Sequence, residues 1–336
     1  MSPSGTPKIV FNMRVKLKLF FFLLLLPAVM VSSCQSKYSY LPPLMEVQKL
    51  EHEESLGSAP ISVALVLGGG GARGMAHLGV IEALEEAGIQ IDLIVGCSAG
   101  SIVGALYADN PDSKKIRAIL APLNKWDLLD YDLLQSQYGI GKGTSIAKLL
   151  ESNLSAKNFK DLKIPLVVVA TDLKTGESVA LDKGSIETAT RASSAIPGYF
   201  EPIEIDGRVL VDGAVVNQVP VDVALRYKAE MIIAVDINEV LAPEMPTNFL
   251  GVAKRCMEIK FYHQNQSCLQ GADFVIKPDV GQIGTFDDGD KHLIYEAGKM
   301  AALKMIPQIT EAKAMQIQFH QTCAGITSIA DASGIH

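Results

Sequence analysis

Short apolar runs alternate along this chain with longer stretches whose apolar residues recur at helical spacing. Runs of strand length end at Leu67 and at Val95, and two more occupy residues 165–170 and 231–236. They are apolar at nearly every position, which is typical of strands buried on both faces of a parallel sheet. The pattern predicts an α/β fold with a parallel-sheet core and helices on both faces.

The stretches between and after these runs have helical periodicity or helix-capping residues. The helices expected from them span residues 99–108, 144–154, 185–194, 219–227, 247–269 and 290–307. Residues 177–181 are expected to form a hairpin with the strand at 165–170, and 272–276 a further strand. Pro307 is expected to end the last helix, because proline lacks the N–H that a helix interior needs.

The first residues have the composition of an export signal. Residues 1–18 contain four basic side chains and no acidic one, and 19–31 are largely apolar. Thirteen residues are too few for a membrane span but suit a signal peptide, which starts at Met1 or Met13. Val31-Ser32-Ser33-Cys34 resembles a bacterial lipobox, which implies a lipidated Cys34 and a membrane-anchored lipoprotein of a bacterial envelope, outer membrane or surface. An ordinary secretory signal is the alternative.

The chain divides into five segments by composition. Residues 1–33 are the predicted signal peptide. Residues 34–60, which contain Pro42-Pro43 and a polar stretch, are the predicted lipidated tether. A globular body occupies 61–227 and continues through 228–312. The signals in 313–336 are weak, and this tail is left unassigned.

Charge and cysteine content exclude some classes of function. The 336 residues contain 30 Lys and Arg against 37 Asp and Glu, a net charge of −7. Nucleic acid is therefore not an expected partner, because phosphate contacts need clustered basic residues. Cys97, Cys256, Cys268 and Cys323 are expected to be free and mostly buried, and their spacing predicts no metal site. A Cys256–Cys268 bridge would require the helix between them to break.

A run of four glycines follows the first strand, at residues 68–71. Without side chains, its backbone N–H groups can form an anion nest or an oxyanion hole. Gly69-x-Gly71-x-x-Gly74 also matches the dinucleotide fingerprint, which requires an acidic residue at the end of the second strand. Asp92 lies at the start of that strand instead, so a nucleotide site is the weaker alternative.

A serine follows the second strand. Gly96-x-Ser98-x-Gly100 has the spacing of a nucleophile elbow, in which a strained turn needs small neighbours on both sides of the serine. The alternative is a simple helix cap by Ser98. Much later, Asp212 follows another short apolar strand and is a candidate base for Ser98, although Asp-Gly alone is most often a turn.

Together these motifs resemble the patatin-like phospholipase family over residues 61–223. The resemblance rests on the glycine run with Arg73 and Gly74, on the elbow with Gly96 and Gly100, on Asp212-Gly213-Ala214, and on the segments 170–173 and 195–202. It implies a patatin-like catalytic domain with Ser98 as nucleophile, Asp212 as its base and Gly69, Gly70 and Gly71 as the oxyanion hole.

The function expected from this resemblance is serine acyl hydrolysis of phospholipids or other lipid esters, of the phospholipase A, lysophospholipase or esterase type, without a metal or cofactor. A nucleotide- or lipid-binding module that uses the glycine turn without hydrolysis is the alternative. No oligomeric state is predicted.

Three further features are open at the level of sequence. Arg73 can contact a lipid phosphate, support the turn through nearby carbonyls, or form a surface salt bridge. His77 can complete a triad with Ser98 and Asp212, but packing or hydrogen bonding is the preferred interpretation. The apolar segment 122–143 is a hypothetical lid or acyl groove, with core packing as the alternative.

Overall fold

The computed structural model describes residues 60–124, 127, 130, 139–238, 241, 243–281, 283–284 and 290–333. All of them belong to one compact unit, Ser55–His336. The segment from Tyr131 to Tyr138 and most of its apolar neighbours lie outside these residues, so the lid hypothesis is untested. Among the described residues, no helix combines the length and the apolar character that a membrane span needs.

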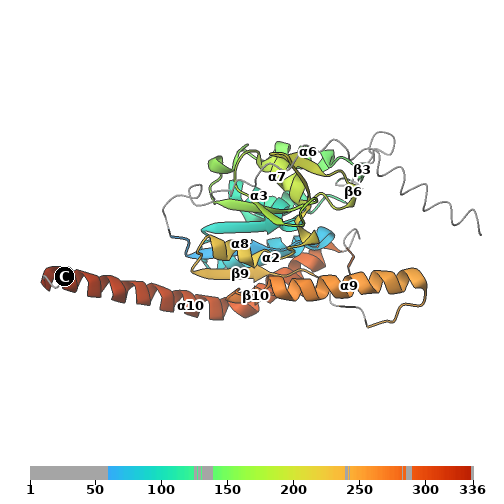
Figure 1. The fold of residues 1–336 in the computed structure, drawn as a ribbon. Helices are drawn as coiled ribbons and strands as arrows, with labels where there is room; N and C mark the ends of the chain where they lie inside the picture. The colour runs from blue at the N-terminus through green and yellow to red at the C-terminus, as the bar shows by residue number, and fades with distance from the viewer. Residues whose placement is uncertain are drawn as a thin grey trace, which may run out of the picture. The chain divides into compact units, whose positions relative to one another are not determined.

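An eight-stranded sheet forms the centre of this unit (Figure 1). Seven strands follow the order β10-β9-β1-β2-β4-β8-β7, and β5 pairs with β4 off this path. The five from β10 to β4 are parallel, whereas β5, β7 and β8 run antiparallel to their neighbours. The strand bounds are β1 Val63–Leu67, β2 Leu93–Cys97, β4 Leu166–Asp172, β5 Ser178–Leu181, β7 Ile203–Ile205, β8 Arg208–Asp212, β9 Met231–Val235 and β10 Phe274–Ile276.

Two short strands, β3 (Gly139–Gly141) and β6 (Gly198–Phe200), pair separately. The α-helices are α2 Met75–Glu86, α3 Ala99–Asp109, α4 Ser113–Leu120, α6 Thr144–Asn153, α7 Ile186–Ser193, α8 Val221–Arg226, α9 Phe249–Cys268 and α10 Lys291–Ser333. Short 3-10 turns, η2 Gly71–Gly74, η3 Phe159–Asp161 and η4 Gly213–Val215, complete the described elements.

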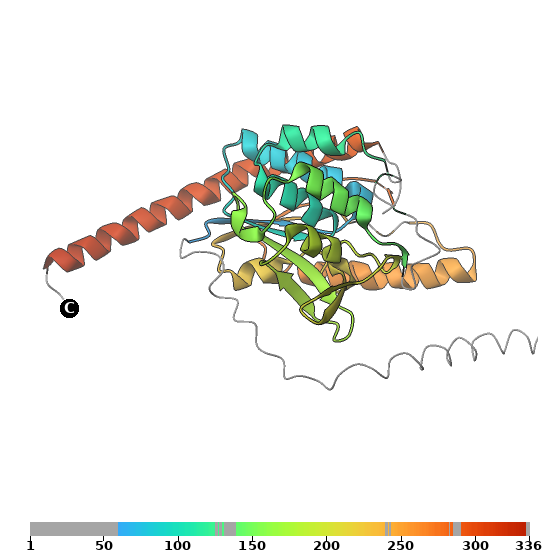
Figure 2. The ribbon, with the colours of Figure 1, turned by 90° about the horizontal axis from the view of Figure 1, so that it is seen from above.

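The sheet is buried on both faces, as the apolar runs predict. Alternate residues of β1 belong to different apolar clusters: Leu65 packs in the cluster that contains α2, α4 and α10, and Val66 in the one that contains α8. Figures 1 and 2 show α2 and α10 side by side and the sheet between the helical layers. This confirms the predicted α/β architecture.

α10 crosses α2 at a point where both helices carry glycine. A Cβ on Gly79 would lie 2.0 Å from the Tyr295 carbonyl oxygen, and one on Gly298 would lie 2.0 Å from that of Ala76. Beside this crossing, Lys299 Nζ lies 2.9 Å from carboxylate oxygens of both Glu82 and Glu86. Backbone contact and paired charges therefore dock α10.

Several sequence expectations need correction here. α10 does not end at Pro307 but continues to Ser333, because a helix can lose one backbone hydrogen bond at a proline when the residues beyond favour helix. Cys256 is exposed rather than buried, while Cys97 is buried and Cys268 intermediate, and all three are free. Both Cys256 and Cys268 lie in the unbroken helix α9, so they do not pair.

Candidate active site

Ser98 occupies the turn between β2 and α3 in a strained conformation. Its φ of 49° lies in the left-handed region, which costs energy for a residue with a side chain. The turn is tight: a Cβ on Gly96 would lie 2.7 Å from the Ser101 Cα, and one on Gly100 would lie 2.1 Å from the Leu67 carbonyl oxygen. Both elbow glycines are thus required by space. The Ser98 side chain makes no capping hydrogen bond to α3.

The sheet register explains why Asp212 meets Ser98. Val168 and Val169 of β4 pair with both β2 and β5, so these two strands lie on opposite edges of β4. Ala170 pairs with both β5 and β8, which places β8 on the same edge as β2. β2 and β8 therefore run toward each other along this side of β4. Ser98 directly follows the last residue of β2, and Asp212 is the last residue of β8.

The two side chains form one buried hydrogen bond. Ser98 Oγ donates to Asp212 Oδ2 at 2.7 Å, and the Ala214 N–H donates to Oδ1 at 2.8 Å. Burial of the carboxylate outweighs both bonds and raises the pKa of Asp212 to about 6. At neutral pH the group is therefore ionised, yet much more basic than a free aspartate.

Three hydroxyl groups hold the strand ends in place. Ser193 Oγ accepts from the Ser98 N–H at 2.8 Å and donates to the Val169 carbonyl at 2.6 Å. Thr171 Oγ1 donates to the Asp212 carbonyl, and Ser101 Oγ to the Ser98 carbonyl. Sequence analysis did not identify these residues, because single hydroxyls inside ordinary helices and strands have no local signature.

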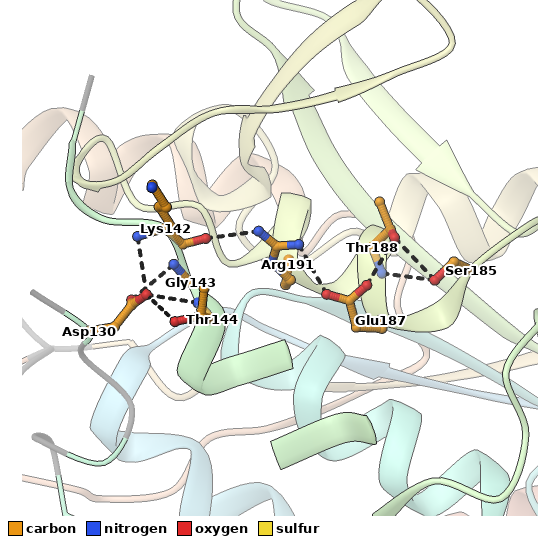
Figure 3. A network of polar contacts seen from close by, with 8 residues as sticks. All are labelled: Asp130, Lys142, Gly143, Thr144, Ser185, Glu187, Thr188 and Arg191. Carbon is orange, nitrogen blue, oxygen red and sulfur yellow. Dashed lines mark hydrogen bonds and ion pairs between the residues drawn. The ribbon is translucent and has the colours of Figure 1, made fainter. Parts of the chain in front are cut away.

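A polar network beside the site fixes α7, the helix that carries Ser193 (Figure 3). Arg191 binds Glu187 one turn earlier and donates to the Lys142 carbonyl at 2.9 Å. Asp130 accepts from the Lys142, Gly143 and Thr144 N–H groups and from the Thr144 hydroxyl, and so caps α6. The network links α6 to α7 by side chains.

The glycine run is held by backbone contacts that leave part of it free. The Gly68 N–H donates to the Val235 carbonyl and the Gly69 N–H to that of Gln218. Within the part of the chain that the structure describes, the N–H groups of Gly70 and Gly71 donate to no protein acceptor. Of the three glycines predicted to form an oxyanion hole, Gly69 thus has its N–H bonded to protein, and Gly70 and Gly71 do not.

His77 is buried beneath this run and does not bond to Ser98. Its Nε2 lies 2.8 Å from the Gly68 carbonyl oxygen, which is the hydrogen-bonding role that the sequence favoured. Burial lowers the pKa of His77 to about 4, against smaller raising effects from Gly68 and Asp236. At neutral pH the ring is uncharged and donates Nε2–H to the turn.

Arg73 and Cys97, the other polar residues of the two turns, are both buried. Arg73 Nη1 donates to the Ile283 carbonyl at 2.9 Å, one of the contacts with nearby carbonyls that the sequence left open. Burial raises the pKa of the Cys97 thiol, which disfavours a thiolate nucleophile. No cluster of three or more potential metal ligands occurs among the described residues.

Comparison with known proteins shows what the chain resembles in sequence and in fold. Residues 65–225 match the model of the family described as patatin-like phospholipase. An uncharacterized NTE family protein of Mycobacterium tuberculosis is 38% identical over 182 residues, 54% of this chain and 51% of that protein. Human patatin-like phospholipase domain-containing protein 6 is 34% identical over 190 residues, 53% of this chain and 13% of that protein.

The structure of VipD from Legionella pneumophila superimposes with a TM-score of 0.52 at 16% identity, covering 74% of this chain and 67% of that one. This likeness confirms a patatin-like α/β fold. The chain spans about half the length of the mycobacterial relative. The matched region contains the glycine run, Ser98 and Asp212.

Proposed function

We propose that this chain, whose residues 65–225 match the patatin-like phospholipase family model, hydrolyses ester bonds of phospholipids or related lipids through a Ser98–Asp212 dyad. The observation that carries the proposal is the buried 2.7 Å bond from Ser98 Oγ to Asp212 Oδ2 on a strained elbow. A helix cap or a structural turn needs neither the strain nor the buried carboxylate.

The dyad supports a two-step acyl transfer. Asp212 takes the proton of Ser98 as Oγ attacks the ester carbonyl carbon, and the carbonyl oxygen becomes an oxyanion. In this proposal the N–H groups of Gly70 and Gly71, which donate to no acceptor among the described residues, stabilise this charge. Collapse of the intermediate breaks the ester bond, and protonated Asp212 returns its proton to the leaving alkoxide.

Water completes the cycle. Asp212, again ionised, removes a proton from a water molecule that attacks the acyl-serine. A second oxyanion forms and collapses, the fatty acid leaves, and Ser98 regains its proton. A pKa of about 6 suits this alternation, because a catalytic group works best when its pKa lies near the operating pH.

The test compares the full chain with three site variants and one control variant, on a soluble short-chain ester and on a phospholipid. Ser98→Ala and Asp212→Asn are each expected to lower kcat by about 1,000-fold or more. Gly70→Ala is expected to lower kcat by about tenfold or more, because the new Cβ would lie 2.6 Å from Ile237 Cδ1 and displace the turn. Ser267→Ala, an exposed serine on α9, is the matched control and should stay within twofold of the parent. Hydrolysis that survives Ser98→Ala would contradict the proposal.

The rival function is a binding module that uses the glycine turn without hydrolysis. A fluorophosphonate separates the two, because an activated serine reacts covalently with it and a binding site does not. Labelling at Ser98 that disappears in Ser98→Ala supports the hydrolase. An unlabelled, folded chain that still binds lipid would support the module.

We further propose export and lipidation at Cys34, which lies outside the described residues. The basic, apolar and Ser-Ser-Cys segments in succession support it. Incorporation of labelled palmitate into the parent and not into Cys34→Ala would support a lipoprotein. Equal labelling of both would contradict it.

A further inference from the structure

α9 carries its apolar side chains mainly at exposed positions. The less exposed positions recur every three or four residues and are mostly polar: Gly251, Arg255, Glu258, Tyr262 and Asn265. Arg255, for example, donates to the carbonyl of Glu244 in the preceding loop. The exposed positions are largely apolar: Phe249, Leu250, Val252, Met257, Ile259 and Phe261. This inverts the usual arrangement of a surface helix, in which the apolar stripe faces the core.

The last turns of α9 are bonded to the segments that follow β8 and β9. Asn265 Nδ2 donates to Asp236 just beyond β9, and Gln264 Nε2 donates to the Val215 carbonyl. The fifteen residues before Gln264 continue past these contacts, a length of about 22 Å at 1.5 Å per residue. Figures 1 and 2 show this end of α9 extending beyond the sheet, on the side of β3 and β6.

The extended part of α9 lies at the edge of the sheet where the parallel strands end, which also holds the candidate active site. β9, β1 and β2 are parallel, so Asp236, the glycine run and Ser98 all follow carboxyl ends on the same side. Phe249 and Leu250, 84% and 75% exposed, begin the helix at its far end. The most exposed apolar side chains of the helix are thus those farthest from the sheet.

The charge of α9 differs from that of the whole chain. The helix contains Lys254, Arg255 and Lys260 against the single acid Glu258, although the chain carries seven more acidic than basic residues. Lys254 is 81% exposed, and Lys260 is exposed between Ile259 and Phe261. Exposed apolar residues mixed with basic ones fit an anionic lipid surface, because the apolar side chains enter the bilayer and the basic ones are attracted to its head groups.

We propose that the N-terminal half of α9 is a membrane-docking helix that inserts Phe249 and Leu250 into an anionic bilayer and turns the Ser98 edge toward it. The choice of a bilayer as occupant rests on the proposed function, since the ester substrates would lie in that surface. A second copy of the chain seated on α9 would instead cover the edge at which substrate arrives.

Insertion is measured with a tryptophan placed on the helix. In full-length Ser98→Ala/Trp126→Phe protein, which lacks the native tryptophan, Leu250→Trp is expected to shift its emission to the blue on vesicles of phosphatidylglycerol and to be quenched by brominated lipid. Phe319→Trp is the matched control: it is 66% exposed on α10, beside His320, which contacts Glu230 at the opposite edge of the sheet. It should show neither effect.

Three outcomes would overturn the inference. They are unchanged emission of Leu250→Trp, equal shifts for both tryptophans, and a shift without vesicles that accompanies dimer formation in sedimentation. Equal response to phosphatidylcholine and phosphatidylglycerol would overturn the part that rests on charge.

Catalysis supplies an independent readout. With Ser98 intact, Phe249→Ser/Leu250→Ser is expected to lower hydrolysis of vesicular phospholipid at least tenfold and to leave a soluble short-chain ester within twofold. An equal effect on both substrates would contradict docking. If neither substrate is hydrolysed by the parent while Leu250→Trp still inserts, the proposed function fails and the docking helix stands.

Discussion

Each carboxylate oxygen of Asp212 accepts one hydrogen bond, but burial has the larger effect on the pKa of this group and raises it to about 6. Because a general base must be unprotonated, kcat/KM on a soluble ester is expected to rise about tenfold per pH unit below 6 and to level above it. His77, with a pKa of about 4, does not titrate in this window. The profile is measured from pH 4.5 to 8, and a level rate across that range would exclude Asp212 as the base.

The same carboxylate should reduce stability at neutral pH. Folded Asp212 holds its proton up to about pH 6, whereas an unfolded aspartate releases it near 3.9, so the folded state binds more protons between these values. The free energy of unfolding therefore falls as pH rises through this window, by about 3 kcal/mol in total. Asp212→Asn is expected to be about 1–3 kcal/mol more stable than the parent at pH 7.5 and equal to it near pH 4, in urea unfolding.

Asp109 provides a control, because its pKa is shifted in the opposite direction to that of Asp212. Burial acts to raise its pKa, but hydrogen bonds from the Ser155 and Ala156 N–H groups and from the Ser155 hydroxyl outweigh burial and lower it. Its ionised form is therefore favoured in the folded state. Asp109→Asn should destabilise the protein at pH 7.5, and a gain in stability there would contradict this account of both carboxylates.

Single residues differ in how far the sequence predicts them. Ser98 and Asp212 stand in short motifs whose spacing follows from turn geometry, and the structure brings them within 2.7 Å. Ser193 and Thr171 act through contacts 95 and 41 residues away in sequence, which local spacing does not encode. The hydrogen bond from the Gly69 N–H to the Gln218 carbonyl likewise joins residues far apart in the sequence.

At the scale of elements, the crossing of α2 and α10 depends on two glycines that approach the opposite backbone. Gly298→Ala would place a Cβ 2.0 Å from the Ala76 carbonyl oxygen, and backbone cannot rotate away as a side chain can. The helices must separate, so we expect a loss of about 2–4 kcal/mol in the free energy of unfolding, despite the better helix propensity of alanine.

Met300→Ala is the matched control for this crossing, because Met300 is 53% exposed on the same helix. Its effect should stay within about 0.5 kcal/mol in urea unfolding. Equal stability of Gly298→Ala and the parent would show that the helices do not meet at these glycines.

The sequence predicts elements best where burial is uniform. The runs that became β1, β2, β4 and β9 are apolar throughout, and Ser185 caps α7 through the Thr188 N–H as expected. The sequence does not predict that α10 continues beyond Pro307, because a proline inside a helix lowers helix stability by about 3 kcal/mol. The packing of the residues before Pro307, which offsets this cost, cannot be seen in the sequence. That the apolar side chains of α9 are exposed cannot be recognised without the positions of the surrounding residues.

At the scale of the whole molecule, several separate features converge on the carboxyl edge of the sheet. The elbow, the glycine run and the loop that precedes α9 all follow parallel strands there, where α/β proteins generally hold their ligands. Asp212 arrives from an antiparallel strand that meets β2 end to end on β4. One edge thus combines the candidate nucleophile, base and oxyanion donors with the proposed docking helix.

All parts of this edge belong to Ser55–His336, so catalysis on soluble ester should not need the residues before it. A chain that begins at Ser55 is expected to unfold in one cooperative transition and to keep kcat/KM within twofold of the full chain. A chain that begins at Ala64 is the control. It lacks the Ile61 and Ser62 carbonyls that accept from Glu230 and Met231, and the first residue of β1, so it should fail to fold. Loss of soluble-ester activity in the chain from Ser55, with its fold intact, would show that the preceding residues take part in the site.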